Sequence, residues 1–375
     1  MAKSSAIKLI KPNLSRQAIE AVAEIIESGR LVCGPVVERF ERGLAEYLGV
    51  PEVVCVSSGT AALHLALLAA GVSPGDEVIV PAFTFPATAN VVEHIGAKPI
   101  FADNFPGGIN IDADKLESLI SRKTKAIMPV HAFGFPAAVD RILEIADRHG
   151  IPVIEDAACA LGSRFGGKLC GTFGAMAAFS FHPRKLLTTG EGGAIAVKDK
   201  NTAALLKSLR NHGNSNGEFC QAGYNYRMTE MQAAVGLTQL EKYDEYIGER
   251  DRLAGIYRQI LGNDLNVKIE MPQPNTTPNW QTLLAQVGSG IGRDKLISFL
   301  ATQGIESAIG TYCVPLTPYY RQKYGFKPND FPWAYEAFND RISLPLYHGM
   351  PVTDIEKVVG AIRQFEKSPM EVVSS

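Results

Sequence analysis

Short apolar runs alternate with longer amphipathic segments from about residue 50 to about residue 200. Seven of these runs have the length and the β-branched content of strands: Val53–Ser57, Glu77–Pro81, Pro99–Ala102, Ala126–Val130, Pro152–Asp156, Ala177–Phe181 and Ala194–Val197. Helical periodicity lies between several of them, at Ala61–Ala70, Pro86–His94 and Ala137–His149. Strands that are apolar throughout and separated by helices are typical of a mainly parallel sheet covered on both faces.

The pattern changes after residue 243. The segments expected there are a charged helix at Asp244–Ile260, a Pro- and Asn-rich connection at Met271–Asn279, a strand at Trp280–Val287, and helices at Arg293–Gln303 and Thr353–Phe365. We therefore expect an α/β chain with two domains. The large domain, residues 14–243, would hold a mainly parallel seven-stranded sheet, and the small domain, residues 244–375, would be α+β.

Charge and cysteine content narrow the classes of partner. The 37 basic and 39 acidic residues nearly balance, so the chain has no excess of cations to bind nucleic acid or an anionic membrane. No apolar run approaches the length of a membrane span, and the N-terminus lacks the apolar core of a signal peptide. The six cysteines and seven histidines show no metal-ligand spacing. These features predict a cytoplasmic protein without a metal.

Lys185 is the candidate catalytic residue. It follows the apolar run Ala177–Phe181 and precedes a Gly-rich turn that enters the next strand. Most lysines are solvated surface charges, but turns at the ends of strands are where α/β folds place ligands. A lysine that is partly desolvated there can lose its proton and attack a carbonyl, as the lysines of pyridoxal phosphate (PLP) enzymes do.

Three further groups supply what PLP needs besides an amine. Asp156, at the end of an expected strand, can hold the pyridine nitrogen protonated, although it could instead cap a following helix. Gly59, in a Ser- and Thr-containing strand-to-helix turn, allows an anion to approach the helix start, and Ser180 offers a hydroxyl. Phe85 offers a ring face, or else packs in the core. Four such candidates at successive strand ends predict a PLP site.

These segments resemble the DegT/StrS-type sugar aminotransferases, a family of fold-type-I PLP enzymes. The resemblance begins at Ser28-Gly-Arg-Leu-Val-Cys-Gly-Pro35 and continues through SSGTAALHLAL, PAFTFPATAN, EDAACALGS and SFHPRKLLTTGEGGAIAV. It extends through LRNHG, GYNYRMTEMQAAVG and SLPLYHGM, so it covers nearly the whole chain. The lysine segment and GYNYRMTEMQAA are the most specific of these motifs.

The resemblance implies a role for ten residues. Lys185 would hold PLP covalently as an internal aldimine and act as general acid and base, and the other cofactor contacts would be Gly59, Thr60, Phe85, Asp156, Cys159, Ser180 and Asn225. Asn225 would reach the phosphate in the neighbouring subunit, which implies a homodimer with its active sites at the interface. Tyr312 and Arg227 lie in segments that resemble substrate-facing parts of the family.

One departure from the family concerns the cofactor. Cys159 stands where many relatives carry Gln, Glu or His near the phenolic oxygen, and a thiol is a weak donor. Related sugar dehydratases replace the lysine with histidine, so the retained Lys185 favours transamination.

The resemblance implies transfer of an amino group from an amino acid, L-glutamate, to a keto sugar carried on a nucleoside diphosphate. A keto-cyclitol acceptor, a cysteine-dependent desulfuration using Cys220, and a non-catalytic PLP-binding regulator remain alternatives. The sugar, the nucleotide and the carbon that is aminated stay open.

Overall fold

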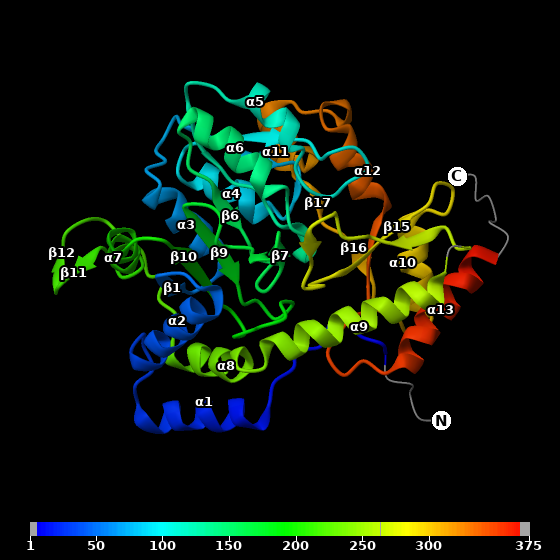
Figure 1. Cartoon of the computed structure of the whole chain (residues 1–375), viewed down its shortest axis with the longest axis horizontal. Coiled ribbons are helices and arrows are strands. Elements are labelled where there is room, and N and C mark those ends of the chain that lie inside the picture. Colours follow the sequence, from blue (N-terminus) through cyan, green and yellow to red (C-terminus); the bar gives the residue numbers. More distant parts are fainter. Residues whose placement is uncertain (1–5, 263, 368–375) are drawn as a thin grey trace.

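The computed structural model describes residues 6–262 and 264–367. Its helices are α1 (Arg16–Ser28), α2 (Pro35–Leu48), α3 (Gly59–Ala69), α4 (Pro86–His94), α5 (Leu116–Leu119), α6 (Val139–His149), α7 (Lys200–Leu209), α8 (Glu230–Leu240), α9 (Tyr243–Leu261), α10 (Arg293–Thr302), α11 (Pro318–Tyr324), α12 (Pro332–Asp340) and α13 (Val352–Lys367). Figure 1 shows a central sheet among helices and, above the right-hand half of α9, a second sheet with α10 beside it.

The central sheet has seven strands. They are β1 (Glu52–Val56), β2 (Glu77–Pro81), β4 (Lys98–Ala102), β5 (Thr124–Ile127), β6 (Ile154–Asp156), β9 (Met176–Ser180) and β10 (Gly193–Val197). Two ladders, β1-β10-β9-β6 and β4-β2-β5, are joined by the parallel bridges Ile127 to Val153 and Val130 to Asp156. Only β10 runs against its neighbours in this sheet. The expected mainly parallel, seven-stranded sheet is confirmed.

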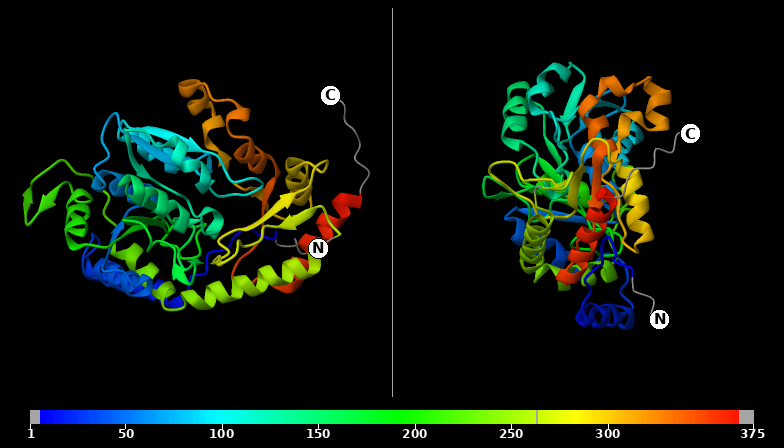
Figure 2. Two further views of the ribbon diagram at one scale, coloured as in Figure 1. Left: turned by 45° about the horizontal axis from the view of Figure 1, so that its top comes forward. Right: turned by 90° about the vertical axis from the view of Figure 1, so that its right-hand side faces the viewer.

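The later part of the chain forms a second sheet. Its order is β13-β15-β18-β16, with β13 at Val267–Ile269, β15 at Leu283–Val287, β16 at Ala308–Ile309 and β18 at Arg341–Leu344. The ladders are antiparallel, α10 packs beside β16 and β18, and α13 packs against α9 and α10. Helix α9 passes from below the central sheet to this second sheet (Figure 2). The boundary at residue 243 falls at the start of α9 and stays a prediction.

Seven short strands complete the fold. The hairpin β7 (Arg164–Phe165) and β8 (Lys168–Leu169) pairs with β14 (Thr276–Thr277), and the hairpin β11 (Asn214–Ser215) and β12 (Glu218–Phe219) projects from the molecule beside α7 (Figure 1). The pair β3 (Phe83–Thr84) and β17 (Tyr312–Cys313) joins residues far apart in the sequence.

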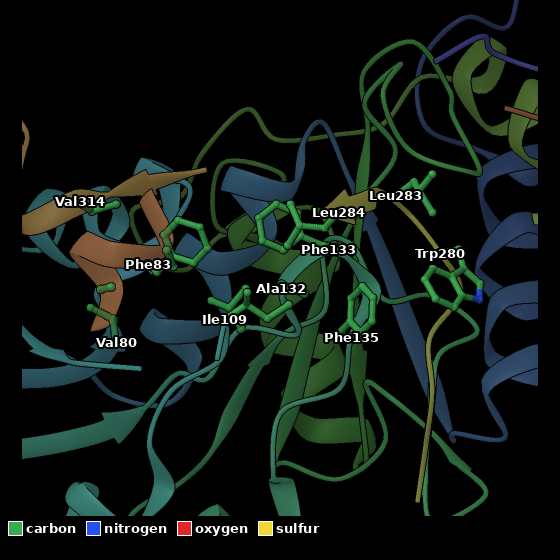
Figure 3. Packing of buried hydrophobic residues seen from close by; sticks show 14 of the residues in the cluster. Val80, Phe83, Ile109, Ala132, Phe133, Phe135, Trp280, Leu283, Leu284 and Val314 are labelled. Atoms are coloured by element: carbon green, nitrogen blue, oxygen red, sulfur yellow. The ribbon is translucent and has the colours of Figure 1, made fainter. Parts of the chain in front are cut away.

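The expected strand at Trp280–Val287 was wrong in its first three residues. Trp280 has a φ of 53°, which is left-handed backbone and breaks a strand, so β15 begins only at Leu283. Trp280 is buried instead, with its ring edge-on to Phe135 at 5.4 Å between ring centres. Figure 3 shows Phe133 and Phe135 between Phe83 and the segment from Trp280 to Leu284. This packing joins the two sheets in one continuous apolar core.

No helix in residues 6–262 and 264–367 is long and apolar enough to cross a membrane. Within the same residues, no group of three or more His, Cys, Asp and Glu side chains is placed to hold a metal ion.

Candidate active site

A cavity of about 620 Å³ lies at the carboxyl ends of β1, β5, β6 and β9. Parallel strands present their following turns at one edge of the sheet, so side chains from distant parts of the sequence meet there. Seven of the ten expected site residues line the cavity: Gly59, Thr60, Phe85, Asp156, Cys159, Ser180 and Lys185. Residues of the second sheet, among them Ile309 and Leu344, close it from the opposite side.

Asp156 forms the buried acidic end of the site. Its side chain is 4% exposed, and Thr88 Oγ1 donates to its Oδ2 at 2.8 Å while the Ala158 N–H donates to Oδ1 at 3.2 Å. Burial raises the pKa of Asp156, and these hydrogen bonds and the Lys185 charge oppose that rise. Residues 157–163 are turns rather than a helix, so the helix-cap alternative is excluded. A buried carboxylate of this kind is stabilised by a cation beside it.

Lys185 lies between β9 and β10, in a loop that we call the lysine loop (residues 182–191). Its Nζ donates to Cys159 Sγ at 2.9 Å, inside the cavity. Cys159 is half-buried, in the turn that follows β6 and Asp156. The amine and the buried carboxylate therefore face one space from two neighbouring strands.

The turn before α3 is a tight cradle. The Ser58 hydroxyl accepts from the Ala61 N–H at 3.1 Å and so begins the helix. A Cβ on Gly59 would lie 2.7 Å from Ser180 Cβ, and a Cβ on Gly193 would lie 2.5 Å from the carbonyl carbon of Ser58. Only glycine allows these approaches, which bring the helix start and the Ser180 hydroxyl together. Such a helix start is an anion site of the kind that binds phosphate.

Phe85 stands at the wall of the cavity and not in the core. Its side chain is 64% exposed at the start of α4, so the core-packing alternative is excluded. Pairing of β3 with β17 places Tyr312 opposite Thr84, and the rings of Phe85 and Tyr312 are 6.5 Å apart. Tyr312 itself is not among the residues that line the cavity.

Asn225 and Arg227 lie outside the cavity of their own chain. Asn225 is exposed, and an Arg227 guanidinium N–H donates to the Asn211 side chain. The segment is nevertheless tied to the phosphate-type cradle, because the Ser57 N–H donates to the Tyr226 carbonyl at 2.8 Å. Three of the ten residues are thus not brought to this cavity within one chain.

Several residues of the site were missed in the sequence. Thr88 could have been found, because it lies in the same motif as Phe85, PAFTFPATAN. Its hydroxyl lies 2.9 Å from that of Thr84 and donates to Asp156. Leu9, Arg250 and Gln281 come from remote segments and carry no local signal that would place them in the cavity.

The donor set fits PLP. An amine and a buried carboxylate share a cavity whose wall also holds a glycine cradle at a helix start and an exposed aromatic ring. These are the aldehyde-binding, pyridinium-binding, phosphate-binding and ring-covering groups that the cofactor requires.

Comparisons with known proteins agree with this geometry. The chain is 40% identical over 367 residues to GDP-perosamine synthase of Caulobacter vibrioides, covering 96% of this chain and 98% of that one. A crystal structure of DesV from S. venezuelae in complex with a ketimine intermediate has a TM-score of 0.92 and 33% identity, with 98% of this chain and all of that chain (100%) covered.

A sugar aminotransferase described as putative, Spr1654 from Streptococcus pneumoniae, has been solved in its PMP form with a TM-score of 0.91 and 28% identity. That match covers 96% of this chain and 97% of the other. The likeness in fold confirms the expected fold-type-I architecture. The profile of the DegT/DnrJ/EryC1/StrS aminotransferase family matches residues 12–363, and the chain belongs to that family.

Proposed function

We propose that this protein uses PLP held on Lys185 to transfer an amino group from L-glutamate to a keto sugar linked to a nucleoside diphosphate. The observation that carries the proposal is the shared cavity of Lys185 and the buried Asp156, beside the glycine cradle at α3. The expected enzyme class, a PLP-dependent sugar aminotransferase, is confirmed by the family. The similarity to GDP-perosamine synthase supports the nucleotide-linked acceptor.

The geometry of the site supports a role for each group that would contact the cofactor. Bound PLP supplies an electron sink for the pair of electrons left when the α-carbon of the amino donor loses its proton. Asp156 would sustain that sink, because its buried negative charge favours a proton on the pyridine nitrogen. Gly59, Thr60 and Ser180 would hold the phosphate, and Phe85 would cover one face of the ring.

Lys185 would carry the proton. In each half-reaction its Nζ takes a proton from one carbon and delivers it to another, which requires the amine to be neutral and able to swing on its side chain. Cys159, 2.9 Å from Nζ, is the protein group that the amine meets first. Tyr312, beside Phe85, and Arg227 would contact substrate.

We extend the proposal to a homodimer. Asn225 is exposed and lies outside its own chain's cavity, which is what a residue that serves the partner subunit requires. We also place the protein in the cytoplasm, where its six free cysteines would stay reduced.

The alternative of a desulfuration through Cys220 has no support from geometry. Cys220 is exposed next to the β11–β12 hairpin, and it does not line the cavity.

The test is an absorbance trace of the PLP-loaded protein mixed with L-glutamate. The band of lysine-bound PLP should convert to that of pyridoxamine phosphate, and a nucleotide-linked keto sugar should then reverse the change. Lys185→Ala should lose the lysine-bound band and reduce turnover by at least about 10³-fold. An unchanged wild-type band with glutamate, glutamine and alanine would favour the regulator alternative.

A further inference from the structure

Two buried glutamines outside the lysine loop form hydrogen bonds with its backbone. Gln239, from α8, accepts from the Thr188 N–H at 3.1 Å and donates to the Thr188 carbonyl at 2.7 Å. Gln281, from the segment before β15, makes a similar two-sided contact nearer to Lys185. Gln281 also lines the cavity, at 6% exposure.

The Gln281 side-chain amide bonds to the backbone on both sides of Lys185. Its Oε1 accepts from the Leu186 N–H at 3.1 Å, and its Nε2 donates to the Arg184 carbonyl. These are the backbone groups on either side of Lys185. These two hydrogen bonds fix the peptide planes on both sides of the Lys185 Cα. They therefore fix the direction in which the Lys185 side chain leaves the backbone.

Gln281 is itself held rigidly. The Arg250 guanidinium, 3% exposed, donates to the carbonyls of Gln281 at 2.9 Å and of Trp280 at 2.7 Å. The Gln281 N–H donates to Asn279 Oδ1 at 2.9 Å. The left-handed backbone of Trp280 turns the chain between these contacts, and its buried indole donates to Asp251 at 2.8 Å.

The same segment also holds the loop opposite Lys185. Asn279 is 1% exposed, and its Nδ2 donates to the carbonyl of Cys159 at 3.0 Å and to that of Leu161 at 2.8 Å. Asn279 and Gln281 are two residues apart. One short stretch of chain therefore bonds to the backbone on both sides of the Lys185 to Cys159 contact.

We infer that Gln281, supported by Asn279 and Arg250, is a positioning residue that aims Lys185 Nζ at the reacting carbons. This inference rests on the proposed role of Lys185 and adds a residue outside the family motifs in which that lysine was found. Gln281 acts through the backbone of residues 184–186 and needs no contact with substrate. Its loss should slow proton transfer and leave donor affinity nearly unchanged, because a small misplacement of a reacting group costs rate more than binding.

The test compares three variants. Gln281→Met keeps the length of the side chain and removes both hydrogen bonds. Gln281→Glu keeps an acceptor for Leu186 but sets a carboxylate against the Arg184 carbonyl. Gln286→Met is the matched control, because Gln286 lies on the following strand β15 and donates to Asp340 at 2.8 Å, away from the cavity.

Hydrogen exchange of the protein without PLP is the first readout. In Gln281→Met the Leu186 amide should exchange at least about 10-fold faster than in wild type, and in the control it should not change. The rate of the glutamate half-reaction is the second readout, and it should fall about 10²-fold at saturating glutamate in Gln281→Met, with KM changed little. Since exchange needs neither PLP nor turnover, it still reports on Gln281 if the wild type fails to react with glutamate.

The Glu variant adds a pH signature. A protonated carboxyl can again donate to the Arg184 carbonyl, so the rate of Gln281→Glu relative to wild type should rise as the pH falls. If Gln281 only stabilised the fold, the ratio of the Gln281→Glu rate to the wild-type rate would not change with pH. Wild-type exchange at Leu186, or faster exchange with an unchanged rate of the half-reaction, would overturn the inference, and the Glu variant decides it if Gln281→Met does not fold.

Discussion

Lys185 Nζ and Cys159 Sγ lie 2.9 Å apart, on loops that follow the adjacent strands β9 and β6. A thiol is smaller than a Gln, Glu or His side chain, and it is a weaker hydrogen-bond donor than Gln or His. The contact therefore leaves the amine beside a soft, polarisable sulfur inside a cavity that is lined by both apolar and polar side chains.

Alkylation should report on that contact. Without PLP, a small haloacetamide should modify the half-buried Cys159, and PLP should protect it by filling the cavity. Cys220 is exposed and serves as an internal control that reacts in both states. Peptide mass spectrometry measures both sites, and equal labelling of Cys159 with and without PLP would show that the cofactor does not bind next to it.

Asp156→Asn should stabilise the protein without cofactor at neutral pH. Burial raises the pKa of Asp156 above its ordinary 3.8, so the folded chain keeps this proton to higher pH than the unfolded chain does. The stability from that proton is complete below 3.8 and is lost as pH rises through the folded-state pKa. We expect the variant to gain on the order of 2 °C in Tm relative to wild type between pH 4 and pH 7.

With PLP, wild type should become more stable than Asp156→Asn, because in the proposed site the cofactor's cationic ring nitrogen would pair with the carboxylate. PLP should raise the Tm of wild type more than that of Asp156→Asn. If the variant is less stable than wild type at pH 7 without PLP, the hydrogen bonds to Asp156 and the Lys185 charge outweigh the cost of burying the carboxylate, and the prediction is wrong.

Gly59→Ala should damage the cradle. The new methyl would lie 2.7 Å from Ser180 Cβ, so the turn must open, at a cost of about 1–3 kcal/mol. The displaced helix start should weaken PLP binding, which a fluorescence titration measures. Gly248→Ala is the matched control, since that glycine is exposed on α9 with nothing within 4 Å of a Cβ, and it should be neutral or slightly stabilising.

Mixed dimers test the reach of Asn225. Lys185→Ala and Asn225→Ala should each be impaired alone. If Asn225 serves the partner, random mixing of the two variants restores about a quarter of all sites to wild-type composition. The two variants are mixed, unfolded and refolded together, and the activity of the mixture should exceed the sum of the activities of the two variants alone. No gain in activity would place both residues in the site of one chain.

The sequence predicted those elements whose signals are local. Pro86 begins α4 where expected, and the apolar run Glu77–Pro81 is strand β2 residue for residue. Strand ends alone predicted five residues of the cavity, because parallel strands put their turns at one edge; these are Lys185, Asp156, Gly59, Ser180 and Phe85. Thr60 and Cys159 were expected only from the family resemblance. Trp280 was misassigned because its apolar, β-rich surroundings favour a strand. Its carbonyl instead accepts a hydrogen bond from Arg250, and the preceding Asn279 donates to the carbonyls of Cys159 and Leu161. No local pattern reveals those long-range partners.

The hydrogen bond from the Ser57 N–H to the Tyr226 carbonyl links the cradle to the segment that carries Asn225. In the proposed dimer, the turn that would hold one subunit's phosphate is thereby hydrogen-bonded to the segment whose Asn225 would reach the partner subunit. PLP bound at the first site would order the segment with Asn225 that the second site needs. The entropic cost of binding the second PLP would then be lower. PLP should therefore load with positive cooperativity, and a dimer with one cofactor should be scarce at half saturation.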